Sequence, residues 1–217
     1  MEAGKPLPIL SAPEVRVLGA LIEKSKTTPD YYPMTVNALV AACNQKTSRY
    51  PVVNYDEETI LSALSSLKGQ SLVSTAVGGG SRVIKYKHNF TTVYPLSEKE
   101  LALLCLLFLR GAQTPGELNT NSGRLYEFSS LQSVQEALDQ LSTSEPPFVK
   151  ELAKRPGQKE ARYCQLLSEH LQEQEETYDE LPHKNKTEER IHELETELSD
   201  VKERLEKLEA LFRQLND

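Results

Sequence analysis

The sequence has no tryptophan and only three cysteines, Cys43, Cys105 and Cys164, in 217 residues. These cysteines are far apart along the chain and form no Cys-x-x-Cys pair or Cys/His cluster. Neither a zinc site nor a disulfide framework is therefore predicted. We expect three buried thiols in a reducing compartment.

Long apolar runs are also missing. The longest, Leu101–Leu109, is too short to span a bilayer. Residues 1–11 do not show a basic flank followed by an apolar core, so no signal peptide is predicted. We expect a cytoplasmic protein without membrane contact.

Catalytic motifs are absent as well. No GxSxG, HExxH or GxxxxGK[ST] string occurs. The histidines at positions 88, 170, 183 and 192 have no nucleophile partner in a recognisable motif. Gly78–Gly80 lies between two expected strands rather than before a helix, which favours a hairpin tip over a nucleotide loop. We expect a protein that is not an enzyme, with no catalytic residue, cofactor or metal.

The chain has no overall basic excess, since its formal net charge is −7. Residues 1–167 carry 18 basic and 16 acidic side chains, whereas residues 168–217 carry 7 and 16. The acidity therefore belongs to the C-terminal segment, and the body is close to neutral. Any electrostatic footprint for nucleic acid must be a local patch.

The most informative stretch runs from residue 56 to residue 90. Apolar residues at helical spacing predict an amphipathic helix over Asp56–Lys68, which Gly69 is expected to end. Strands are predicted over Leu72–Val77 and Arg82–His88, with lysines on one face of the second. A helix that leads into a hairpin with a basic outer face is typical of a winged helix-turn-helix domain.

The pattern then repeats. The matching strings are Leu10-Ser11-x-x-Glu14 with Leu96-Ser97-x-x-Glu100 and Thr28-Pro29 with Thr114-Pro115, both 86 residues apart, and Ala63-Leu64-x-x-Leu67 with Ala137-Leu138-x-x-Leu141, 74 apart. A period this long indicates duplicated domains rather than a solenoid. Further helices are predicted over 11–26, 35–44, 97–110, 115–122 and 131–142, and further strands over 148–154 and 161–167.

The predicted fold class is α+β, mainly α with small β-hairpins. Two tandem winged helix-turn-helix domains, residues 11–93 and 96–168, follow a flexible arm over residues 1–10. An acidic linker over residues 169–186 then leads to a coiled-coil helix over residues 187–217.

Four longer strings carry a family resemblance. They are RVLGALIEK at residues 16–24, NALVAACNQK at 37–46, QTPGEL at 113–118 and PGQKEARY at 156–163. With them, the chain resembles the YceH-like family of uncharacterised bacterial proteins over nearly its whole length. The resemblance implies a tandem winged-helix fold. It implies no activity, because the family has no established function.

The basic side chains near the hairpins are candidate nucleic-acid contacts. They are Lys46, Arg49, Arg82, Lys85 and Lys87 in the first repeat, and Lys150, Lys154, Arg155, Lys159 and Arg162 in the second. Such contacts give salt-dependent affinity for DNA or RNA that is blind to sequence. The alternative is a solvated hairpin face. Gln132 and Gln135 on the last helix of the second repeat are of a type that reads adenine.

The first repeat also offers an argument against DNA. Its third helix begins with Asp56, Glu57 and Glu58, which would meet phosphates with like charge. The rival hypothesis is a protein-interaction or docking module that uses the winged-helix domains as a scaffold. A continuous stripe formed by the two basic hairpins would favour nucleic acid, and hairpins that point apart would favour docking.

The polar string around Asn37, Asn44, Gln45 and Lys46 has two interpretations. Helix capping and loop hydrogen bonds to residues 47–50 are the favoured one. An anion or nucleic-acid pocket shared with Arg49 is the other.

The tail has an unbroken heptad seam. Its members are Ile191, Leu194, Leu198, Val201, Leu205, Leu208, Phe212 and Leu215. In a parallel homodimer the pairs Arg190–Glu195, Glu197–Lys202 and Arg204–Glu209 all attract, which favours that orientation. The alternative is that the stripe folds back onto its own chain. A dimer would bring two pairs of hairpins together, as in readers of paired half-sites.

Overall fold

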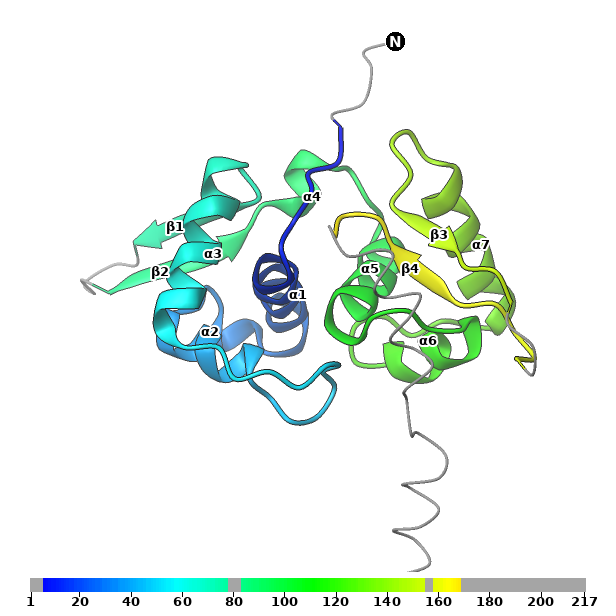
Figure 1. Ribbon diagram of the computed structural model, residues 1–217, viewed down its shortest axis with the longest axis horizontal. Helices are drawn as coiled ribbons and strands as arrows, with labels where there is room; N and C mark the ends of the chain where they lie inside the picture. Colours follow the sequence, from blue (N-terminus) through cyan, green and yellow to red (C-terminus); the bar gives the residue numbers. More distant parts are fainter. Residues whose placement is uncertain (1–5, 78–82, 155–157, 169–217) are drawn as a thin grey trace, which may run out of the picture. The chain divides into compact units, whose positions relative to one another are not determined.

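Each sequence repeat folds as three α-helices followed by a two-stranded antiparallel hairpin (Figure 1). The computed structural model describes residues 6–77, 83–154 and 158–168, and all of them fall in one compact unit. The first repeat comprises α1 (Ala12–Thr27), η1 (Pro29–Tyr31), α2 (Val36–Cys43), α3 (Glu57–Gly69), β1 (Val73–Val77) and β2 (Ile84–His88). After α4 (Phe90–Val93), the second comprises α5 (Glu98–Arg110), α6 (Pro115–Ser122), α7 (Leu131–Thr143), β3 (Val149–Glu151) and β4 (Tyr163–Gln165). The α+β class is confirmed.

The first helix of each repeat begins with the same capping box. The Glu14 carboxylate accepts the backbone N–H of Ser11 at 2.6 Å, and the Glu100 carboxylate accepts that of Ser97 at 2.8 Å. These bonds satisfy backbone donors that the helix itself leaves free. The 86-residue offset at this point is therefore a structural repeat as well as a sequence repeat.

The third helices bury the same positions. Ile60, Ala63, Leu64 and Leu67 of α3 are buried, as are Val134, Ala137, Leu138 and Leu141 of α7, each 74 residues further on. The expected role of Gly69 at the end of α3 is wrong, however. Gly69 is the last helical residue, and Ser71 has the left-handed backbone (φ 66°) that lets the Leu72 N–H bond the Leu67 carbonyl.

A short bridge ties each hairpin back to the start of the second helix. Met34 exchanges two backbone hydrogen bonds with Tyr86 of β2, and Gln113 exchanges two with Tyr163 of β4. Thr35 and Thr114 then cap α2 and α6. Thr114 thus corresponds to Thr35 rather than to Thr28, and the predicted Thr28-Pro29 match is wrong because η1 is an insertion in the first repeat.

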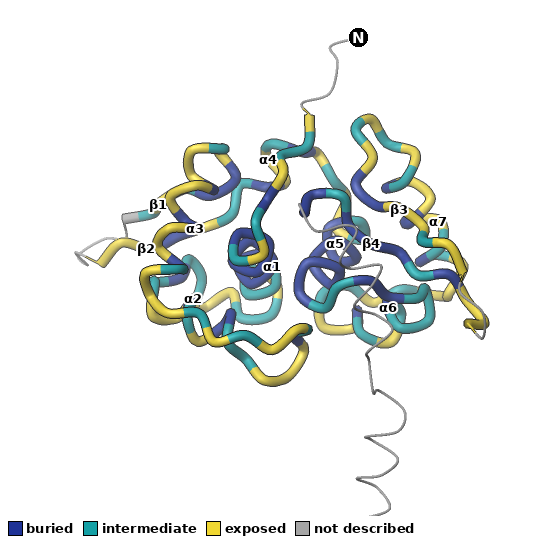
Figure 2. Tube along the Cα trace, in the orientation of Figure 1, coloured by how far each residue is buried: buried dark blue, intermediate teal, exposed yellow. Residues whose placement is uncertain are grey.

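The two repeats pack through their first helices, α1 and α5. Gly19 permits this approach, since a Cβ placed there would lie 3.0 Å from Phe108 Cβ and from Leu109 Cδ2. The Cys105 thiol donates to the Gly19 carbonyl at 3.4 Å, and the Tyr50 N–H donates to the Leu109 carbonyl at 2.8 Å. Figure 2 shows α1 and α5 as largely buried helices. The core is therefore continuous across the repeats.

Several predicted features lie outside the described residues. They are the first half of the N-terminal arm, the glycine tip of the first hairpin, the acidic linker and the heptad helix. The three cysteines are all buried free thiols, as expected. In the described part of the chain, no helix has the length and apolar character needed to cross a membrane.

Candidate functional site

The first hairpin presents lysines on the side away from the core. Tyr86 of β2 is buried, while its neighbours Lys85 and Lys87 pair with Ala76 and Ser74 of β1 on the opposite face. Lys87 is exposed and Lys85 is half-buried. Side chains alternate along a strand, so burial of Tyr86 turns both lysines outward. Arg82 lies outside the described residues.

The second hairpin has a shorter ladder, and there a buried residue is followed by an exposed one on β3 only, because all three residues of β4 are buried. Val149 of β3 and Tyr163 of β4 are buried, and Lys150 between them in the ladder is exposed. Lys154 and Lys159, which flank the tip, are exposed as well. Arg155 lies outside the described residues.

Arg49 has an internal role that the sequence analysis did not anticipate. Its guanidinium is buried and forms a bidentate pair with Glu23 of α1, at 3.0 and 2.6 Å, while its Nε donates to the Ala42 carbonyl. Burial disfavours the charged form of Glu23, but hydrogen bonds and charge from Arg49 outweigh it and lower the pKa of the carboxyl. Arg49 is thus a structural residue and is removed from the candidate contacts.

Arg162 also has partners within the chain, and it too is removed from the candidate contacts. Both of its terminal nitrogens lie 2.9 Å from Glu117 oxygens, and one also donates to the Ala112 carbonyl. The pair joins β4 to the first turn of α6. Because the guanidinium holds these acceptors, it is not presented to a phosphate.

The polar loop over residues 44–55 is held by hydrogen bonds, which supports the capping interpretation. The Asn44 side chain accepts the Tyr55 N–H and donates to the Tyr55 carbonyl, both at 2.8 Å. Its partner is Tyr55 rather than residues 47–50. The buried Arg16 donates to the Cys43 and Pro51 carbonyls. Of the residues of the expected anion pocket, Asn37 and Lys46 are exposed, and Lys46 is the one that carries a positive charge.

The exposed face of α3 is acidic and partly apolar. Asp56 caps the helix by accepting the Thr59 N–H at 2.8 Å, and this hydrogen bonding lowers the pKa of the Asp56 carboxyl. Glu57 and Glu58 are exposed in the first turn. One turn on, Leu61 is 42% exposed. This surface repels a phosphate backbone and exposes a large apolar side chain.

The corresponding face of α7 is neutral at its start. Leu131 and Gln132 are exposed, and a groove of about 550 Å³ separates them from the second hairpin and its Lys154. Gln135 also lines the groove, but its amide donates to the Tyr163 hydroxyl at 2.7 Å and to Asp139 at 3.0 Å. Both glutamines that were expected to read bases have partners within the chain, since the Gln132 amide donates to Glu136 at 3.4 Å.

The hairpins lie at opposite ends of the described unit. In Figure 1 β1 and β2 project beyond α3 on one side, and β3 lies beside α7 on the other. The paired helices α1 and α5 lie between them. The lysines of the two hairpins therefore do not form one continuous stripe.

His88 is the one histidine within the described residues. Its Nε2 lies 3.3 Å from the Ser25 hydroxyl, and burial together with the charge of Lys26 lowers its pKa to about 4. In the described part of the chain, no three His, Cys, Asp or Glu side chains converge on a position that could hold a metal.

Comparison with known proteins places the chain in a family. Residues 10–158 match the model of a protein family of unknown function, DUF480. The chain belongs to the DUF480/UPF0502 family. A UPF0502 protein of Shewanella piezotolerans is 45% identical over 206 residues, which cover 89% of this chain and 94% of that protein. One from Solibacter usitatus is 44% identical over 204 residues, covering 94% and 98%.

A UPF0502 protein of Aliivibrio fischeri extends the match further. It is 42% identical over 214 residues, covering 96% of this chain and 99% of that protein. Membership agrees with the resemblance seen in the sequence. The family is uncharacterised, so function has to be argued from the surfaces.

Proposed function

We propose that the chain is a tandem winged-helix protein, not an enzyme, that binds duplex nucleic acid through its two basic hairpins. The observation that carries the proposal is the outward placement of lysines on both hairpins, opposite buried core residues. The order of three helices and a hairpin, with a bridge before the second helix, supports the winged-helix assignment.

The contacts that we assign are lysines alone. They are Lys85 and Lys87 on the first hairpin and Lys150, Lys154 and Lys159 on the second, with Lys46 as an outlying member. A lysine ammonium is a compact charge that neutralises a phosphate without reading a base. The affinity should therefore be salt-dependent and independent of sequence.

Separation of the hairpins sets the mode of binding. Because they lie at opposite ends, a short duplex engages one hairpin at a time. In the second repeat the groove beside Gln132 and Lys154 is also lined by Glu151 and Glu160, so the duplex contacts the lysines at the edge of the groove. In the first repeat the acidic start of α3 keeps the duplex on the hairpin alone.

The test is a salt titration of binding to random-sequence duplex DNA and RNA, followed by fluorescence anisotropy. Lys85→Glu with Lys87→Glu, and Lys150→Glu with Lys154→Glu, should each weaken binding and flatten its salt dependence. Each lost phosphate contact should reduce the log–log slope by about 0.9 for duplex DNA. Lys68→Glu with Lys99→Glu is the control, because it makes the same charge change away from the hairpins. An unchanged slope in both hairpin variants, or no binding by the parent at low salt, would refute the proposal.

We also propose that the heptad segment forms a parallel homodimer, which would bring four hairpins into one particle. The proposal rests on the seam and on the attracting pairs in its sequence. Leu198→Asp with Leu205→Asp should give a monomer whose helix content is otherwise retained, measured by sedimentation and circular dichroism. A parent protein that sediments as a monomer at tens of micromolar would exclude the dimer.

The second candidate function, docking to a protein, is favoured by the separation of the hairpins and by the exposed face of α3. Neither feature is needed for phosphate binding.

A further inference from the structure

The face of α3 that points away from the core carries negative charge beside an apolar side chain. Leu61 lies one turn after Glu57 and Glu58, at the spacings that make side chains neighbours on a helix. Leu61 is 42% exposed, so no described residue covers it fully. The equivalent positions of α7, 74 residues on, hold Leu131, Gln132 and Gln135, and so no carboxylate.

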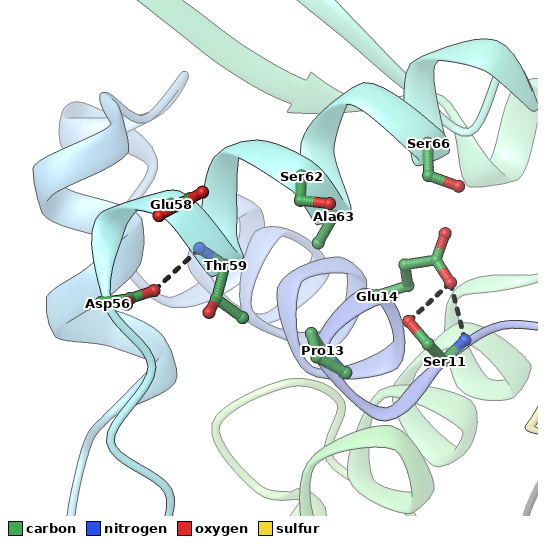
Figure 3. A pocket seen from close by; sticks show the side chains of 9 residues that line it. All are labelled: Ser11, Pro13, Glu14, Asp56, Glu58, Thr59, Ser62, Ala63 and Ser66. Atoms are coloured by element: carbon green, nitrogen blue, oxygen red, sulfur yellow. Dashed lines mark hydrogen bonds between the residues drawn. The ribbon is translucent and has the colours of Figure 1, made fainter.

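A cavity of about 530 Å³ extends this face toward the start of α1 (Figure 3). Three carboxylates line it, from Glu14, Asp56 and Glu58, and no basic side chain does. The remaining lining residues are small or hydroxyl-bearing, such as Ser62 and Ser66. The cavity is therefore open, negatively charged and not obstructed by large side chains.

One carboxylate oxygen of Glu14, Oε1, accepts no hydrogen bond from the described residues. The residue is only 7% exposed, and both hydrogen bonds that its side chain accepts, from the N–H and hydroxyl of Ser11, end on Oε2. In Figure 3 the other oxygen points toward Ser66, into the space between α1 and α3. A carboxylate oxygen that faces open space can accept a charge-assisted hydrogen bond from a donor that enters this space.

The carboxylates do not converge on one point. In the described part of the chain no three acidic, histidine or cysteine side chains are arranged to hold a metal ion. Charges spread along a cavity and a helix face suit several cations held on one backbone better than they suit a single ion. Nucleic acid is disfavoured here because its charge has the same sign as that of the surface.

We propose that the α3 face, made by Glu14, Asp56, Glu57, Glu58 and Leu61, docks a basic segment of a partner protein. Lysine or arginine side chains of the segment enter the cavity and meet the carboxylates. An apolar side chain of the segment covers Leu61. Charge complementarity selects the partner, and burial of Leu61 adds affinity that salt does not screen.

The experiment uses the full chain and a short fluorescein-labelled helical peptide with two arginines and one leucine on one face. Two companion peptides replace either the leucine by serine or the arginines by glutamine. Anisotropy at low salt should show binding of the first peptide, weaker binding of the serine peptide and none of the glutamine peptide. No binding of the first peptide would overturn the proposal.

Substitutions then locate the contact. Glu57→Gln with Glu58→Gln should weaken binding about fivefold or more, and Leu61→Gln, which copies the residue of α7, should weaken it about threefold. Glu136→Gln with Asp139→Asn makes the same charge change on the exposed face of α7 and is the matched control. Equal effects in the control and the α3 variants would mean general attraction to an acidic protein and would overturn the proposal.

Amide chemical shifts give an independent location. Addition of the arginine–leucine peptide should move the resonances of residues 11–14 and 56–66 and leave those of α7 unchanged. Movement centred elsewhere would overturn the proposal. So would a change in the sedimentation of the α3 variants alone, because the occupant would then be a second copy of the chain. The lysines that carry the nucleic-acid proposal are untouched in every variant, so either proposal can fail without the other.

Discussion

Helices α3 and α7 occupy the same place in the two repeats, yet they resemble each other on one side only. Their buried residues match position by position at an offset of 74, with isoleucine and valine exchanged at one site. Their exposed carboxylates lie at different positions, since Glu57 and Glu58 correspond to Leu131 and Gln132, whereas Glu136 and Asp139 correspond to Ser62 and Ser65. Packing in the core thus restricts which residues the buried face can carry, whereas the exposed face can carry residues that bind a different partner in each repeat.

The largest expected difference between the repeats concerns their two internal arginines. Arg49→Met should lower the free energy of unfolding by about 3 kcal/mol or more, because it leaves the largely buried Glu23 without the bidentate pair and with Lys24 as its remaining cationic partner. Arg162→Met should cost about 1 kcal/mol, since the Arg162–Glu117 pair is partly exposed, with side-chain exposures of 24% and 44%. Urea denaturation of both variants measures the difference. Equal losses of unfolding free energy would show that burial does not determine how much each ion pair contributes to stability.

Two glycines provide the next contrast. Gly19→Val should destabilise the chain by about 2 kcal/mol, because its side chain would strike Phe108 and Leu109 across the repeat interface. Gly69→Ala should be neutral or stabilising by up to about 1 kcal/mol, since nothing lies within 4 Å and alanine favours a helix. Thermal melts compare the two. If Gly19→Val melted at the parent temperature, the close approach of α1 to α5 would not matter for stability.

A titration should distinguish the hairpins. His88 pairs with Val73 at the ladder position where Gln165 pairs with Val149. Because the folded pKa of His88 is about 4 against an ordinary 6.5, the unfolded chain binds more protons between these values. Stability from this site is present above pH 6.5 and is lost as the pH falls toward 4, by at most about 1.4 kcal/mol per unit. His88→Gln, which copies the second repeat, should remove this slope from the pH dependence of urea midpoints.

The smallest difference between the repeats is expected at the helix caps, where equivalent substitutions should cost the same free energy. Ser11→Ala and Ser97→Ala should each cost about 1 kcal/mol, because both serines cap a helix through the same box. Chemical denaturation of the two single variants tests whether the costs agree. A much larger cost at Ser11 would indicate that its part-buried setting adds to the cap.

Local signals were sufficient to predict the helices. Apolar spacing and caps place α6 at its observed bounds and α3 within one residue, because both depend on neighbours a few positions apart. Long-range pairing was not predictable in the same way. Arg49 and Arg162 looked like surface cations, and only the fold brings them to Glu23 and Glu117, which lie 26 and 45 residues away in the sequence.

The alignment of the two repeats was also not fully predictable from local sequence. Thr28-Pro29 and Thr114-Pro115 share letters at the expected offset, but the capping threonine of α2 is Thr35. An insertion between two helices shifts the register without changing either helix. The acidic face of α3 was visible in the sequence, whereas the cavity beside it required α1, more than forty residues earlier, to be placed.

Contact between α1 and α5 means that each repeat presents the same element to the other. In this one respect the described unit resembles a homodimer, in which subunits related by a twofold axis meet through the same surface. Either repeat produced alone would expose apolar side chains of this contact, such as Phe108 and Leu109 of α5, and should pair with a second copy of itself rather than remain a monomer.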